Sequence, residues 1–100
     1  MYAIVTRRRM NPAQTDAIRA RFTRDYRQAL AQAPSFASFT LVEGESGVNT
    51  AILVFDTKEE ADAFLDHPAI VAWRQELEAL GHHLEMEDRG PVMQALSLSR

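Results

Sequence analysis

Residues 36–43 (FASFTLVE) and 48–56 (VNTAILVFD) are two runs rich in aromatic and β-branched residues, separated by the short segment 44–47 (GESG). Such runs are typical of β-strands, and a segment bounded by glycines is typical of a tight turn. The sequence therefore predicts an antiparallel hairpin over residues 36–56.

The second strand of this hairpin is apolar on both of its faces. Side chains alternate along a strand, so every second residue shares a face. The two faces carry Thr50, Ile52 and Val54, and Ala51, Leu53 and Phe55, respectively. An antiparallel sheet with one face in water would instead alternate apolar with polar residues. We therefore expect both faces of the sheet to be covered.

A helix is expected before the hairpin. Asn11 is a favourable N-cap, and Pro12 suits the first helical turn because its missing N–H needs no partner there. Pro34 ends the segment. The apolar stripe of this helix has a spacing of four residues and consists of Ile18, Phe22, Tyr26 and Leu30.

A second helix is expected after the hairpin. Thr57 and Glu60 form a capping box at its start, and Gly81 closes it. His67-Pro68 interrupts it, because a proline disfavours the helical conformation of the residue before it. Its apolar stripe consists of Ala61, Phe64, Leu65, Ile70, Trp73, Leu77 and Leu80.

Two further strand-like runs, at residues 2–6 and 82–88, give the order βαββαβ. We expect one α+β domain over residues 1–100, with a ferredoxin-like antiparallel four-stranded sheet and two helices on one face. Because the other face is also apolar, a second copy of the chain is expected to cover it in a homodimeric α/β barrel. An apolar tail, residues 90–100, follows a break at Gly90-Pro91 and could cross to the partner subunit.

The composition limits the partners and the compartment. The net charge of −3, from 14 acidic and 11 basic residues, argues against nucleic-acid binding. We interpret the run Arg7-Arg8-Arg9 as a solvated strand end rather than a phosphate or RNA site, because alternation sends its side chains to both faces. The absence of cysteine, of a signal peptide and of eighteen consecutive apolar residues predicts a cytoplasmic protein that does not contact membranes.

The opening 1–6 (MYAIVT), a helix that ends in proline before a phenylalanine-containing strand, and the segment 54–61 (VFDTKEEA) resemble the antibiotic biosynthesis monooxygenase (ABM) family. The likeness extends over most of the chain, to about Leu80. It implies a dimeric α/β barrel. Some members of the family oxidise quinols or polyphenols with O₂ and no cofactor, others degrade haem, and many have no assigned function.

The chain departs from the residues that these activities use in the family. Quinone-forming members usually carry a tryptophan at the position of Phe55 and an asparagine at that of Ala51, and neither side chain here can donate a hydrogen bond. Haem-degrading members place an asparagine, a tryptophan and an iron-ligating histidine at the positions of Thr6, Phe64 and Arg74. Because an arginine does not ligate haem iron, we expect no haem and no other cofactor.

Aromatic residues with polar tips make a candidate ligand site. Tyr26 and Trp73 lie on the apolar stripes of the two helices, and each carries one donor. Core packing is the simpler interpretation of such a stripe, and a pocket for a flat aromatic molecule between the helices and the sheet is the functional one. The residues predicted to bind a ligand there are Thr6, Phe22, Tyr26, Phe55, Phe64 and Trp73.

Metal and hydrolytic chemistry are not favoured by the sequence. His82 and His83 are adjacent, so on a strand they point to opposite faces and cannot readily hold one ion. We predict no metal site and expect these histidines, like His67, to be exposed or hydrogen-bonded, with a general base as the alternative role. The sequence contains no Ser-His-Asp arrangement, phosphate loop or nucleophile elbow, and no catalytic residue is assigned.

The leading interpretation is an ABM-like protein that binds a small hydrophobic or aromatic molecule and, if it is an enzyme, is a monooxygenase that oxidises an aromatic or quinol-type substrate without a cofactor. One alternative is a non-catalytic ligand-binding or stress-associated barrel. Another is a structural dimer with a filled core. A cavity between the helices and the sheet would separate the first two interpretations from the third.

Overall fold

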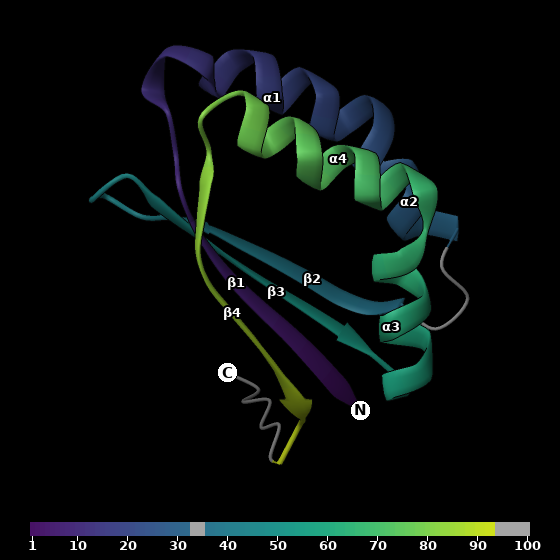
Figure 1. Ribbon diagram of the computed structural model, residues 1–100. Coiled ribbons are helices and arrows are strands. Elements are labelled where there is room, and N and C mark those ends of the chain that lie inside the picture. Colours follow the sequence, from purple (N-terminus) through teal and green to yellow (C-terminus); the bar gives the residue numbers. More distant parts are fainter. Residues whose placement is uncertain (33–35, 94–100) are drawn as a thin grey trace, which may run out of the picture.

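The predicted hairpin forms one side of a four-stranded antiparallel sheet (Figure 1). The computed structural model describes residues 1–32 and 36–93. The strands are β1 (Tyr2–Arg9), β2 (Phe36–Glu43), β3 (Val48–Phe55) and β4 (His83–Pro91), in the spatial order β2-β3-β1-β4. With a helical segment after β1 and another after β3, this order confirms the predicted ferredoxin-like α+β fold.

The last strand is longer than the sequence indicates. Gly90 and Pro91 belong to β4 and pair with β1, where we predicted a break. β4 is an edge strand, and an edge tolerates a proline that cannot donate to the ladder. The Val92 N–H then donates to the Met1 carbonyl at 2.9 Å. The predicted crossing of the tail to a partner falls largely on residues 94–100, which lie outside the described residues.

One helical stretch connects β1 to β2. It consists of η1 (Pro12–Gln14), α1 (Thr15–Arg21), the π-helical turn η2 (Phe22–Tyr26) and α2 (Arg27–Gln32). The Asn11 side chain accepts a hydrogen bond from the Ala13 N–H at 3.2 Å, which confirms the predicted N-cap. π-helical turns are rare and frequently occur at functional sites. This one contains two of the residues predicted for the ligand site.

A second helical segment connects β3 to β4 and is interrupted where the sequence predicts. α3 (Lys58–Asp66) begins after Thr57, whose side chain accepts from the Glu60 N–H at 3.2 Å. α4 (Pro68–Ala79) begins after His67, whose Nδ1 accepts from the Ala69 N–H at 3.1 Å. Gly81 has a φ of +85°, the left-handed conformation expected of a glycine that closes a helix.

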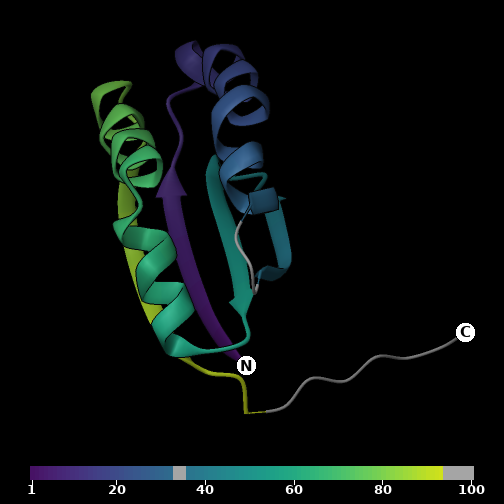
Figure 2. The same ribbon diagram turned by 90° about the vertical axis from the view of Figure 1, so that its right-hand side faces the viewer.

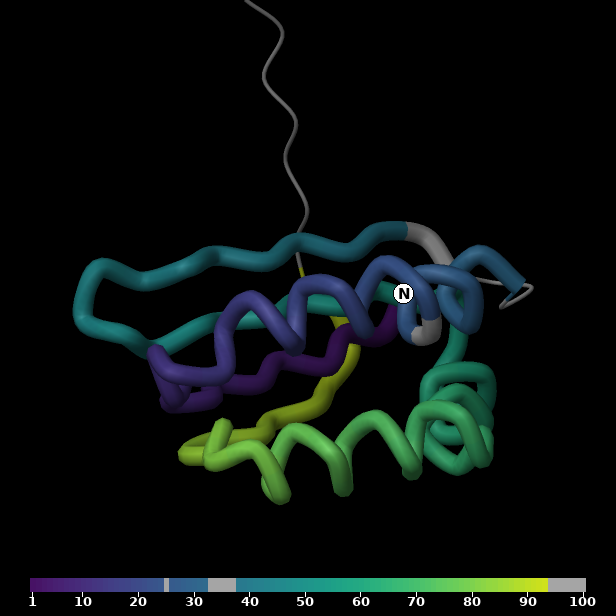
Figure 3. Tube along the Cα trace, turned by 90° about the horizontal axis from the view of Figure 1, so that it is seen from above, coloured from purple at the N-terminus to yellow at the C-terminus, as the bar shows by residue number. Residues whose placement is uncertain are grey.

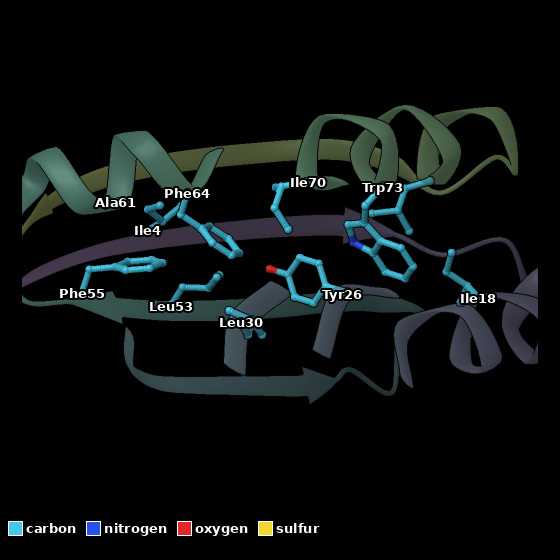
Figure 4. Packing of buried hydrophobic residues seen from close by; sticks show 11 residues of the cluster. Ile4, Ile18, Tyr26, Leu30, Leu53, Phe55, Ala61, Phe64, Ile70 and Trp73 are labelled. Carbon is cyan, nitrogen blue, oxygen red and sulfur yellow. The ribbon is translucent and has the colours of Figure 1, made fainter. Parts of the chain in front are cut away.

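Both helical segments lie on the same side of the sheet (Figures 1 and 2). Seen from above, the first stretch and α4 run side by side, with α4 on the β4 side and β2 at the opposite edge (Figure 3). The hydrophobic core lies between these helices and the sheet (Figure 4). In the described part of the chain, no helix combines the length and the apolar character that crossing a membrane requires.

The sheet face away from the helices is also largely apolar, and none of the helices in residues 1–32 and 36–93 covers it (Figure 2). Val5 lies opposite Ile52 across β1 and β3, and Ile52 lies opposite Thr40 across β3 and β2. These side chains alternate with Ile4 and Leu53, which are buried beneath the helices. The central strands therefore carry apolar residues on both faces, and the described elements of one chain cover only one of these faces with helices.

Candidate functional site

A cavity of about 470 Å³ lies between the helices and the sheet. Its floor is built by side chains of β2, β3 and β1 that point toward the helices. Read across these strands, successive rows of the floor are Phe39, Leu53 and Ile4, then Leu41, Ala51 and Thr6, then Glu43, Asn49 and Arg8. The floor is therefore apolar at one end and polar at the other.

Aromatic side chains of the helices form a wall of this cavity. Phe22 and Tyr26 come from η2, and Trp73 comes from α4. The ring centroids of Tyr26 lie 5.3 Å from those of Phe22 and of Trp73, and Phe22 lies 5.6 Å from Phe39 on the floor. Such distances are typical of interacting aromatic pairs. The four rings offer flat apolar faces of the kind on which an aromatic ligand packs.

Two polar tips of this aromatic cluster lack a partner. Within residues 1–32 and 36–93, neither the Tyr26 hydroxyl nor the Trp73 indole N–H makes a hydrogen bond, although each residue is only 9 % exposed. Burial raises the pKa of Tyr26, so its phenol keeps the proton near neutral pH and can donate. The hydroxyl points toward Leu53 and Phe64 (Figure 4). Neither atom is among the fully buried polar atoms that lack a partner, so both remain accessible and are suited to orient a ligand.

Arg8 provides the charge at the polar end of the floor, and it is buried. Its Nη1 donates to Oε1 of Glu78 at 2.8 Å and to the carbonyl of His82 at 2.7 Å. Burial lowers the pKa of Arg8, because the loss of hydration outweighs the favourable interactions with Glu78. The cavity therefore contains a cation whose charge is incompletely compensated.

The cavity opens to solvent between α1 and β2. Arg19 and Glu43 meet there, with Nη2 of Arg19 at 3.1 and 2.9 Å from the two carboxylate oxygens. Thr23 and Leu41 also line the cavity and are exposed. An exposed ion pair of this kind contributes little free energy, so it does not prevent a ligand from entering.

No family model and no curated protein matches the sequence. Solved structures do. A candidate antibiotic biosynthesis monooxygenase from Deinococcus radiodurans matches with a TM-score of 0.82 over 100% of both chains, at 14% identity. HapK from Hahella chejuensis gives a TM-score of 0.79 over 100% of both chains, also at 14% identity. SnoaB from Streptomyces nogalater, a cofactor-independent oxygenase, gives 0.66 over 99% of this chain and 97% of its own, at 19% identity.

The chain has the fold of the antibiotic biosynthesis monooxygenases. At such low identities the likeness concerns the fold alone. One fold serves many activities, so what this ABM-fold protein does has to be argued from its own cavity.

The residues predicted for the ligand site divide into two groups in this ABM fold. Thr6, Phe22, Tyr26 and Trp73 line the cavity. Phe55 and Phe64 do not line it. Their rings pack against each other in the core with centroids 5.2 Å apart, because they lie where α3 covers the end of the sheet. A ligand-binding role for the first group stays a prediction.

The polar end of the cavity is not evident from the sequence. The interpretation of Arg7-Arg8-Arg9 as solvated is wrong for Arg8, which faces the helices and is buried, whereas Arg7 and Arg9 are exposed. Asn49 joins the site only because β1 and β3 pair in a register that places it opposite Arg8. Alternation along the strand is the only signal that could have singled out Arg8 within its run.

No histidine among residues 1–32 and 36–93 lines this cavity. His82 is buried and hydrogen-bonded through Nδ1, and the exposed His83 lies 3.0 Å from Oε2 of Glu78, as predicted for these residues. Among the described residues, no three histidine or acidic side chains come together as a metal site. Arg74, which stands where haem-degrading members have the iron ligand, pairs with Glu87. The residues present therefore do not fit haem.

Proposed function

We propose that this chain binds a small, flat aromatic molecule in the cavity between its helices and its sheet. The observation that carries the proposal is a cavity of about 470 Å³ with an aromatic wall and two unpaired donors, Tyr26 and Trp73. Small-molecule sites typically have volumes of about 300–1,000 Å³, an apolar lining and a few convergent polar groups. A phenol or quinone suits this chemistry, since its ring packs on aromatic faces and its oxygen accepts a hydrogen bond.

The finer form of the proposal is a cofactor-independent oxidation, supported by the fold shared with the oxygenase SnoaB. A phenol and O₂ would give a quinone and water: the ring C–H opposite the hydroxyl becomes C=O, the hydroxyl loses its proton, and O₂ takes up four electrons. Tyr26 or Trp73, whose donors lie on opposite sides of the Tyr26 ring (Figure 4), would donate a hydrogen bond to the phenolate oxygen and stabilise the electron-rich form that reacts. This donor would replace those that quinone-forming members carry at the positions of Ala51 and Phe55.

Fluorescence of Trp73, the sole tryptophan of the chain, reports binding directly. We expect 2-naphthol and, under argon, 1,4-naphthohydroquinone to quench this fluorescence saturably. Ala51→Phe should abolish the quenching, because it places a ring in the middle of the cavity floor. The matched control is Ala20→Phe on the exposed surface of α1, which should bind as the unmodified protein does. Quenching that survives in Ala51→Phe would contradict this location of the site.

A non-catalytic ligand-binding or stress-associated barrel is the second candidate function. The lack of a donor at Ala51 and at Phe55 favours it. Oxygen consumption separates the two candidates: an oxygenase should accelerate the consumption of O₂ by 1-naphthol, whose C4–H lies opposite the hydroxyl, above the uncatalysed rate, and Ala51→Phe should remove that acceleration. Saturable binding with no acceleration would support the non-catalytic function.

We also propose that the chain forms a homodimer through the sheet face that the helices leave uncovered. This face carries Val5, Ile52 and Val54, and a chain of 100 residues buries only roughly 60–65 % of the surface of its unfolded form. Apolar faces of this kind are commonly buried by two-fold pairing. Light scattering at micromolar concentration should therefore give twice the mass of one chain, and the mass of a single chain would contradict the proposal.

A further inference from the structure

Arg8 has an unusual place for a charged residue. It follows Ile4 and Thr6 on the face of β1 that is turned toward the helices, and it lines the cavity. The other arginines of the lining, Arg19 and Arg74, are less buried than Arg8. A charged group is seldom buried to this degree unless its donors are satisfied.

The donors of Arg8 are only partly satisfied. Nη1 makes both of its hydrogen bonds, to Glu78 and to the His82 carbonyl. Within the described residues, Nε and Nη2 make none. The Glu78 side chain is 47% exposed, so solvent screens the compensation that it gives. One edge of the guanidinium, with parallel N–H groups on Nε and Nη2, is therefore left without an acceptor, and such an edge matches the two oxygens of a carboxylate.

The neighbouring polar side chains of the floor are also unpaired. Asn49 lies directly opposite Arg8 across β1 and β3, and Thr6 lies one row nearer the apolar end. In the described part of the chain, neither side chain makes a hydrogen bond. Glu43, the acidic residue of the same row, is exposed and bound through both oxygens to Arg19, so both solvent and Arg19 reduce the effect of its charge on the subsite. Arg8, Asn49 and Thr6 thus form a polar subsite with more donors than acceptors.

We infer that the ligand of this cavity is an aromatic acid whose carboxylate binds to Arg8 and Asn49. This inference rests on the proposed aromatic site and adds the class of ligand. Ile4 and Arg8 are four residues apart on one strand, about 13 Å. A molecule of two fused rings spans this length with its rings among the aromatic side chains and its carboxylate at Arg8. The carboxylate supplies the bidentate acceptor that Nε and Nη2 lack.

The test compares 6-hydroxy-2-naphthoate with 6-hydroxy-2-naphthamide, a pair of the same shape that differs in charge. We expect the acid to quench Trp73 at a concentration about tenfold lower than the amide in the unmodified protein. Arg8→Gln should reduce this preference to about twofold or less. Arg27→Gln, at an exposed arginine of α2, is the matched control and should keep the preference.

A second variant keeps the test decisive if Arg8→Gln does not fold. Asn49→Leu leaves the bonds of Arg8 to Glu78 and His82 intact and should weaken the binding of the acid about threefold more than that of the amide. Equal binding of the two probes by the unmodified protein would overturn the carboxylate subsite and leave the aromatic site standing. Failure of both probes and of 2-naphthol to quench Trp73 would instead contradict the aromatic site itself.

Discussion

The backbone N–H of Asn11 donates a 2.8 Å hydrogen bond to Nδ1 of His82, a residue with no exposed surface. The Asn11 side chain also donates to the Leu80 carbonyl at 3.0 Å, so the start of the first helical stretch is tied to the turn after α4. An Nδ1 that accepts a hydrogen bond assigns the ring proton to Nε2. The folded chain therefore requires His82 to be neutral.

The pH dependence of folding should show this requirement. Burial lowers the pKa of His82 below its ordinary value of 6.5. As the pH falls through 6.5, the unfolded chain takes up a proton at this residue and the folded chain does not, so the free energy of unfolding decreases. The corresponding stability is fully present above pH 6.5 and is lost toward the lowered folded pKa.

His82→Asn tests this prediction, because the Asn Oδ1 can replace Nδ1 as the acceptor but does not titrate. In urea unfolding between pH 5 and pH 7, the free energy of unfolding should rise more steeply with pH in the unmodified protein than in the variant. Parallel curves for the two proteins would show that His82 is not responsible.

A second pH effect should appear in acid. The Leu84 N–H and His83 are the main hydrogen-bond partners of Glu78, and with Arg8 they lower the pKa of this carboxyl from 4.5 to about 2. A lowered carboxyl pKa stabilises the fold above the unfolded value, and this stability is lost as the pH falls from about 4.5 to about 2. Glu78→Gln should therefore be less stable than the unmodified protein at pH 7 and should show a flatter melting temperature between pH 4.5 and pH 2.

The helix ends and the hairpin could be predicted because their signals are local. The cap formed by Asn11, the capping box at Thr57 and the break at His67 each depend on a few adjacent residues. The alternation in 48–56 likewise separates the two faces of β3. What alternation cannot give is which of these faces meets the helices, since that depends on how distant elements pack.

The residues that line the cavity could likewise be predicted only in part from the sequence. Periodicity places Phe22 and Phe64 on apolar stripes but does not say whether a ring lines a space or fills it. The answer comes from the rest of the packing: Phe64 meets Phe55 at 5.2 Å in the core, whereas Phe22 borders the cavity. The burial of Arg8 could not be predicted from the sequence for a different reason. Three consecutive arginines look alike in sequence, and the packing of the helices on one face of β1 decides which one is buried.

Tyr26→Phe should separate binding from stability. The hydroxyl has no hydrogen bond within the described residues, so its removal should leave the free energy of unfolding unchanged or raise it by up to about 1 kcal/mol. The affinity for 2-naphthol should fall by about 0.5–1.5 kcal/mol, the value of one hydrogen bond. Chemical denaturation and Trp73 fluorescence measure the two quantities.

Phe22→Ala is the comparison for that variant. It enlarges an existing cavity and should destabilise the fold, although by less than the roughly 3–5 kcal/mol of a fully buried phenylalanine, because Phe22 is only partly buried. If Tyr26→Phe proved strongly destabilising and left the affinity for 2-naphthol unchanged, Tyr26 would be a core residue and the orienting donor would have to be another group.

Ile52→Asp should dissociate the proposed dimer. Ile52 lies on the uncovered sheet face, opposite Val5 on one neighbouring strand and Thr40 on the other. In a two-fold interface the substitution would bury an unpaired carboxylate in each subunit, and burying such a charge is costly. Light scattering should then show one chain in place of two, and the melting temperature of the variant should no longer rise with protein concentration.

Val71→Asp, at an apolar residue of α4 that is 40% exposed, is the control and should remain a dimer. If Val71→Asp dissociated the protein and Ile52→Asp did not, the helices rather than the sheet would form the interface.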